Sequence, residues 1–66
     1  MLKLSYDKES DIMEIRFSDN PIEDSEYIED SGLVVDYDKH KKIVAIEILS
    51  FSKKVYKEEL TEALAI

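Results

Sequence analysis

Three acidic residues at alternate positions, Asp7, Glu9 and Asp11, have the spacing of the first three ligands of a calcium-binding loop. The match ends there. Ile12 stands where such a loop needs glycine, and Ser18 stands where it needs a bidentate glutamate. We therefore predict no metal site in this segment, nor elsewhere in the chain.

A second group that could do chemistry is Asp36, Asp38 and His40. The two aspartates lie two residues apart on a predicted strand, so they would share a face and could act as acid and base. The histidine lies among three lysines, which places it in solvent, and no cysteine is present to pair with it. A small hydrolase or isomerase using these residues is the last of our three hypotheses. We predict no enzyme, no catalytic residue and no cofactor.

The composition excludes several other classes of protein. The 66 residues include no cysteine and one glycine, which removes disulfide scaffolds, thiolate metal sites and glycine-rich phosphate loops. The length fits one domain, residues 1–66. No apolar run approaches the ~20 residues of a membrane helix. We expect a cytoplasmic protein with no membrane partner.

Charge is distributed unevenly along the chain. Residues 1–31 carry ten acidic and three basic residues, whereas residues 32–66 carry six of each. The acidic excess peaks in a segment without lysine or arginine, at Asp19, Glu23, Asp24, Glu26, Glu29 and Asp30. Such a surface repels nucleic acid and attracts a basic protein. A solvated surface that only gives solubility would explain the same charges.

Alternating apolar residues predict two hairpins. Leu2–Tyr6 pairs with Ile12–Phe17, and Leu33–Tyr37 pairs with a return strand from Ile43 to about Leu49. The acidic stretch between them, Ile22–Asp30, would form at most an exposed strand at an edge. The hairpins share the tripeptide Tyr-Asp-Lys, which stands at residues 6–8 and again at 37–39. Duplication and chance explain this match equally well.

The return strand is apolar on both faces, with Val44, Ile46 and Ile48 on one and Ile43, Ala45 and Leu49 on the other, interrupted only by Glu47. Two apolar faces need cover on both sides. A predicted helix over residues 52–66, with Tyr56, Leu60, Ala63 and Leu64 at helical spacing, would cover one of them.

Ser52 can serve as the cap of that helix, with Phe51 against Tyr56 as a hydrophobic staple. The predicted fold is therefore α+β, with a small antiparallel sheet of two similar hairpins (four to five strands, residues 1–50) and one C-terminal helix on one face. The second face would need another protein or a second copy, which predicts a dimer interface at Ile43, Ala45 and Leu49.

The order of motifs resembles domain-of-unknown-function family 2283. It comprises Tyr6-Asp7-Lys8-Glu9, an acidic middle, Val35-Asp36-Tyr37-Asp38, and Val44-Ala45-Ile46-Glu47-Ile48-Leu49. The resemblance covers about residues 2–54 and implies an antiparallel sheet with a helix. Some members are encoded beside a small basic protein similar to RelE-type ribonuclease toxins, so it also implies an antitoxin role for those members. The family has no catalytic motif to transfer.

Our first functional hypothesis is a non-catalytic protein-interaction module, concretely an antitoxin-like protein that neutralises a small basic partner. The six acidic residues between Asp19 and Asp30 would imitate phosphate charge. Tyr56, Leu60 and Leu64 would be the buried anchors of a helix in a groove. The alternative is a homodimeric structural module built on the two-sided strand. Neither hypothesis involves direct binding of nucleic acid.

Overall fold

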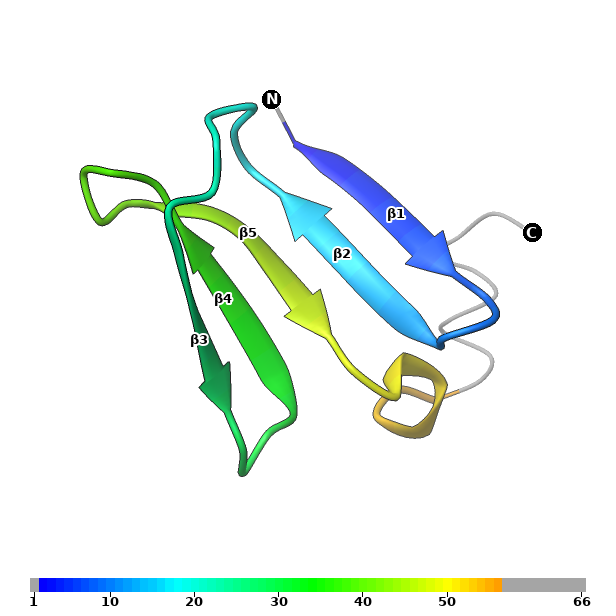
Figure 1. Ribbon diagram of the computed structural model, residues 1–66. Coiled ribbons are helices and arrows are strands. Elements are labelled where there is room, and N and C mark those ends of the chain that lie inside the picture. Colours follow the sequence, from blue (N-terminus) through cyan, green and yellow to red (C-terminus); the bar gives the residue numbers. More distant parts are fainter. Residues whose placement is uncertain (1, 57–66) are drawn as a thin grey trace.

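The computed structural model describes residues 2–56, which form one five-stranded antiparallel sheet (Figure 1). Its strands are β1 (Lys3–Asp7), β2 (Ile12–Arg16), β3 (Asp24–Ile28), β4 (Leu33–Tyr37) and β5 (Ile43–Ile48). The order across the sheet is β1-β2-β5-β4-β3, and every neighbouring pair is antiparallel. The two predicted hairpins are confirmed as β1-β2 and β4-β5. None of the residues 2–56 lies in a helix long and apolar enough to cross a membrane.

The hairpin turns are built by the shared tripeptide. Asp7 Oδ1 accepts a hydrogen bond from the Glu9 backbone N–H at 3.1 Å, and Asp38 Oδ1 accepts one from the His40 N–H at 2.8 Å. In both hairpins an aspartate thus binds the amide two residues ahead, which is an Asx turn. This common local role explains why Tyr-Asp-Lys occurs twice.

The acidic stretch forms a strand at the edge of the sheet. This agrees with the prediction that a strand in this stretch would be exposed at an edge. All five residues of β3 are exposed, and β3 pairs only with β4. The connection from β2 passes the ends of β5 and β4 before it reaches β3 (Figure 1). It is held by bonds from Glu23 N–H to the Tyr37 carbonyl (2.7 Å) and from the Asn20 side chain to Asp38 Oδ2 (3.2 Å).

The two hairpins are related by an approximate twofold axis. Residues 6 and 37 are equivalent, an offset of 31 (37 minus 6), so Ile15 is equivalent to Ile46. These two residues pair with each other across β2 and β5. The pairing of Leu4 with Ile15 likewise recurs as Val35 with Ile46. One hairpin therefore repeats most of the register of the other, and the repeat ends at a bulge, where Tyr37 pairs with Ile43 and not with Val44.

The sheet has one apolar and one polar face. The register places Met13, Ile15, Val35, Val44, Ile46 and Ile48 on the first, which we call the apolar face. Met13, Val35 and Val44 are its buried core. The opposite face, which we call the polar face, carries Glu14 and Arg16 on β2, Glu47 on β5 and Asp36 on β4. The second face of β5 is bordered by these charged residues, and Ala45 on it has no exposed surface.

The predicted α+β class is wrong for the described part of the chain, which is all-β with a single short 3-10 helix, η1 (Phe51–Lys53). Of the predicted helix over 52–66, only residues 52–56 are described, and residues 57–66, with Leu60 and Leu64, lie outside them. Ser50 adopts a left-handed conformation (φ 52°), and Ser52 donates its hydroxyl hydrogen bond to Asp11 Oδ2 at 2.7 Å. The residue expected to cap a helix is therefore used in a tertiary contact.

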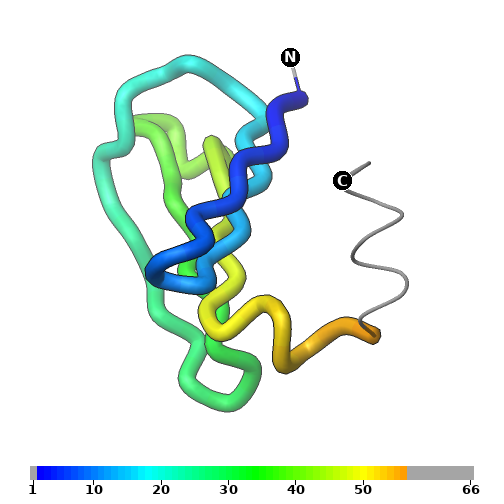
Figure 2. The backbone as a smooth tube through the Cα atoms, turned by 90° about the vertical axis from the view of Figure 1, so that its right-hand side faces the viewer, coloured from blue at the N-terminus to red at the C-terminus, as the bar shows by residue number. Residues whose placement is uncertain are grey.

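The predicted staple between Phe51 and Tyr56 does not form. The Phe51 ring instead packs on Tyr6, with centroids 5.8 Å apart, and Tyr56 is 76% exposed. Tyr6 lies on the apolar face, opposite Met13, so η1 sits at one end of that face. Figure 2 shows the chain leaving the sheet at this end after β5.

Candidate functional site

The apolar face is one candidate site. Its exposed apolar residues include Leu4 of β1 (58% exposed) and Ile28 of β3 (37% exposed) on the two edge strands, and Phe17 (44% exposed) directly after β2. Ile15, Ile46 and Ile48 between them are only half-buried. Among the described elements, only η1 lies against this face, at the Tyr6 end. The face therefore offers a surface suited to another protein.

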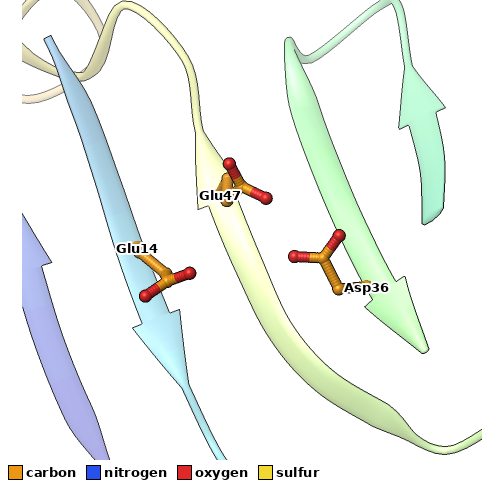
Figure 3. Close-up of side chains that lie close together, drawn as sticks. All are labelled: Glu14, Asp36 and Glu47. Carbon is orange, nitrogen blue, oxygen red and sulfur yellow. The ribbon is translucent and has the colours of Figure 1, made fainter. Parts of the chain in front are cut away.

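The polar face holds a second candidate site, a cluster of three carboxylates from three neighbouring strands. We call Glu14, Asp36 and Glu47 the carboxylate cluster (Figure 3). One oxygen from each residue lies within 4.8 Å of the others. Glu14 pairs directly with Glu47 across β2 and β5, and Asp36 lies diagonally beyond Glu47 on β4. The sheet register alone therefore brings these three side chains together.

The electrostatics of this cluster are unfavourable for three charged carboxylates. Burial raises the pKa of Glu47 above its ordinary 4.5, and so do the neighbouring Asp36 and Glu14; Arg16 opposes them. Arg16 forms an ion pair with Glu14, with 3.4 Å between Nη2 and Oε2. Glu47 consequently holds a proton more readily than an ordinary glutamate does.

Asp36 is the buried member of the cluster, with 2% of its surface exposed. Its Oδ1 accepts a hydrogen bond from the Ser25 hydroxyl at 2.6 Å. Its Oδ2 is buried and has no hydrogen-bond partner among the described residues. In Figure 3 the Asp36 carboxylate extends from β4 toward Glu47.

Five of the six acidic residues predicted to bind a partner gather around the β3 edge of the sheet, whereas Asp19 lies on the β1 side, near Lys3 and Ser5. Asp24 and Glu26 lie on β3 itself, Asp19 and Glu23 on the connection that precedes it, and Glu29 and Asp30 in the turn that follows. All six are exposed. Glu26 also accepts a hydrogen bond from the Tyr37 hydroxyl at 3.1 Å. We call this surface the acidic edge.

The predicted dimer-interface residues are dispersed. Ile43 is 45% exposed, Leu49 is half-buried, and Ala45 has no exposed surface, since it lies between Asp36 and Arg16 in the register. On the other face, by contrast, the apolar residues of neighbouring strands form a continuous surface.

The aspartates weighed for chemistry have structural partners. Asp11 accepts bonds from the Tyr6 hydroxyl (2.6 Å) and from Ser52, and these bonds lower its pKa. Asp38 accepts bonds from the N–H groups of His40 and Lys42, and its pKa is also lowered, chiefly by the Lys42 bond. These bonds hold the two turns, and Asp36 belongs to a different cluster from Asp38.

The carboxylate cluster is the feature that the sequence analysis missed. The available signal was Glu47, the single charge in an otherwise apolar strand. Its partners could not be identified without the register, because Glu14 and Asp36 lie 33 and 11 residues before it (47 minus 14 and 47 minus 36).

Over residues 2–56, the fold and these surfaces define a small all-β sheet in a single layer, with a carboxylate cluster on its polar face. A family model described as "Protein of unknown function (DUF2283)" matches residues 3–52, which contain all five strands and their connections. The chain belongs to this family, which confirms the resemblance. No curated protein and no solved structure shows significant similarity to it.

Proposed function

We propose that this chain is a non-catalytic protein-interaction module that acts as a homodimer, in which the apolar faces of two copies cover each other. The observation that carries the proposal is the exposure of Leu4 and Ile28 on an apolar face that has no second layer among residues 2–56. A sheet with one apolar face is stable when that face is buried against another layer.

A second copy is the occupant that best suits this face. Chains of this size bury only about 60% of their surface when they fold alone, which leaves them marginally stable. Association with a second copy buries further apolar surface and so adds stability. Two identical apolar faces are self-complementary about a twofold axis, which is the geometry of most homodimers. Leu4 and Ile28 lie on opposite edge strands, so such an interface would span the width of the sheet.

The test is the solution mass of the double variant L4K/I28K. Both residues are already exposed, so the sheet should fold as before while two buried lysines oppose dimerisation. Light scattering should give a dimer for the wild type and a monomer for the variant, with the same β-sheet signal in circular dichroism.

The matched control places lysines on the same two strands but on the polar face. Ser5 and Tyr27 are exposed there, so S5K/Y27K should remain dimeric. A monomeric wild type at 1 mM, or an L4K/I28K variant that stays dimeric, would refute the proposal.

The acidic edge favours a second candidate function, an antitoxin-like protein for a small basic partner. Five exposed carboxylates gather along β3 and its flanking segments, which suits a basic surface by charge. The experiment mixes the chain with the protein encoded by the adjacent gene and measures complex formation at low and high salt. E23K/E29K should abolish a salt-sensitive complex, whereas S5K/Y27K should retain it. A partner bound equally by both variants would contradict this candidate.

A further inference from the structure

The carboxylate cluster combines features that a solvated acidic surface lacks. Its three side chains come from neighbouring strands, and their oxygens lie within 4.8 Å of one another on the polar face. Like charges placed opposite each other on a sheet are destabilising. Arg16 offsets part of this repulsion, but its guanidinium lies against Glu14, at one side of the cluster.

Asp36 provides the independent observation that points to a ligand. It is 2% exposed, its Oδ1 is satisfied by Ser25, and its buried Oδ2 has no hydrogen-bond partner among the described residues. A buried carboxylate oxygen needs a donor or a cation, because its desolvation is otherwise uncompensated. The carboxylate extends toward Glu47, on the side of the other two members (Figure 3).

We propose that Glu14, Asp36 and Glu47 form a binding site for a hard divalent cation, with Ca²⁺ preferred to Mg²⁺. Carboxylate oxygens are the ligands that such cations prefer, and the chain offers no thiolate or nearby histidine that would favour a softer metal. The cation would neutralise the repulsion within the cluster and give the Asp36 Oδ2 a partner.

The spacing fits Ca²⁺. Two oxygens bound to one Ca²⁺ can be up to about 5 Å apart, twice its ~2.5 Å bond. The three oxygens of the cluster lie within 4.8 Å of one another, inside that range. Mg²⁺ demands near-ideal octahedral geometry, whereas Ca²⁺ accepts irregular coordination completed by water. With three carboxylates and Arg16 close to one of them, we expect a Kd on the order of 10⁻⁴–10⁻³ M.

The proposal does not depend on the homodimer, because the cluster lies on the face opposite the proposed interface. The test titrates the full chain, stripped with chelator, with CaCl₂ and separately with MgCl₂. Calorimetry should show one Ca²⁺ per chain and weaker Mg²⁺ binding. Ca²⁺ above its Kd should also raise the thermal unfolding midpoint. Backbone amide NMR shifts should change first at Glu14, Asp36 and Glu47.

Two variants remove a ligand without disturbing the fold. E47Q and E14Q each replace a half-buried carboxylate by an amide of the same shape and should weaken Ca²⁺ binding at least tenfold. D36N removes the third ligand, although it also changes the bond to Ser25. The controls E9Q and E23Q remove the same charge at exposed positions away from the cluster and should bind Ca²⁺ as the wild type does.

Two outcomes would overturn the proposal. One is the absence of a Ca²⁺-dependent shift at millimolar concentration, which would leave a proton on Glu47, hydrogen-bonded to Asp36, in place of the cation. The other is an equal loss of binding in E9Q and E47Q, which would show a diffuse attraction of cations to an acidic chain of net charge −7.

Discussion

Asp11 is the residue that ties the first hairpin to the segment after β5. Its carboxylate accepts bonds from the Tyr6 hydroxyl, the Ser52 hydroxyl and the Ser52 N–H, and the Asp11 carbonyl accepts a bond from Phe51. Its backbone is left-handed, with φ 57°, a conformation that aspartate and asparagine tolerate better than most residues. D11N therefore keeps the turn while removing the charged acceptor.

We expect D11N to lower the unfolding midpoint at pH 7 relative to E9Q, which removes the same charge from the same turn. The pKa of Asp11 is lowered in the folded state, chiefly by the bond from Tyr6. Its stabilisation is therefore present above the ordinary pKa of 3.8 and is lost as the pH falls through the lower folded value. In thermal melts between pH 7 and pH 2, the unfolding midpoint of D11N should fall less than that of the wild type. An equal fall of the unfolding midpoint in D11N and in the wild type would refute this role.

Tyr6 is the donor in the same contact, and its pKa is raised, chiefly by that bond to Asp11. The stabilisation that this bond gives the folded state should therefore be complete below the ordinary tyrosine pKa of 10. It should disappear as the pH rises through the raised pKa of Tyr6 in the folded state. Y6F should therefore lack this loss of stability at alkaline pH. Thermal melts at pH 9 to 11.5 would test the expectation. It would be contradicted if the unfolding midpoint of Y6F fell with rising pH as much as that of the wild type.

At Glu47, replacement by glutamine should stabilise the chelator-treated protein. E47Q removes a negative charge that faces Glu14 directly and Asp36 diagonally. Relief of a like-charge cross-strand pair is worth about 0.2–1 kcal/mol. Urea unfolding at pH 7 should give that increase for E47Q and no change for E23Q. If E47Q were instead less stable than the wild type, the Glu47 carboxylate would stabilise the fold, and repulsion from Glu14 and Asp36 would not be its main effect.

At the scale of elements, the turn between β3 and β4 depends on Gly32. Its φ is +68°, its N–H binds the Ile28 carbonyl at 2.9 Å, and its carbonyl accepts the Leu49 N–H at 3.0 Å. A Cβ there would stand 2.7 Å from Lys54 Nζ, the far end of a flexible side chain that also donates to the Leu49 carbonyl. The lysine can move, so the backbone conformation decides the effect of a substitution.

G32A should lower the free energy of unfolding by roughly 1–2 kcal/mol, because a side chain is strained at positive φ. G32N adds a larger side chain but tolerates that conformation, so it should lose less. Urea denaturation of both variants tests this order. If G32N were the less stable variant, the space around Lys54 rather than the value of φ would limit the turn.

At the scale of the whole molecule, the approximate twofold axis between Ile15 and Ile46 organises the sheet. It places β2 and β5 at the centre and brings Glu14 opposite Glu47, so the carboxylate cluster arises where the two hairpins meet. The chain adds β3 beside only one hairpin, which makes the acidic edge one-sided. The proposed dimer interface and the proposed cation site lie on opposite faces, whereas the acidic edge shares β3 with the interface, because the register pairs Glu26 with Val35 on the apolar face.

The sequence by itself determined the local elements of this protein. Alternating apolar residues marked the four hairpin strands, and the acidic stretch was correctly placed as an exposed edge, because strand periodicity and exposure are local properties. The family was also recognisable from its order of motifs. These features need no knowledge of which distant residues meet.

Only the tertiary structure decided the rest. Whether Ser52 capped a helix depended on Asp11, which lies 41 residues before it (52 minus 11) and takes up its hydroxyl group. Whether Glu47 stood alone or in a cluster depended on the register of β2 and β4 against β5. Both outcomes rest on contacts between residues far apart in the chain, and local residue patterns carry no information about such pairing.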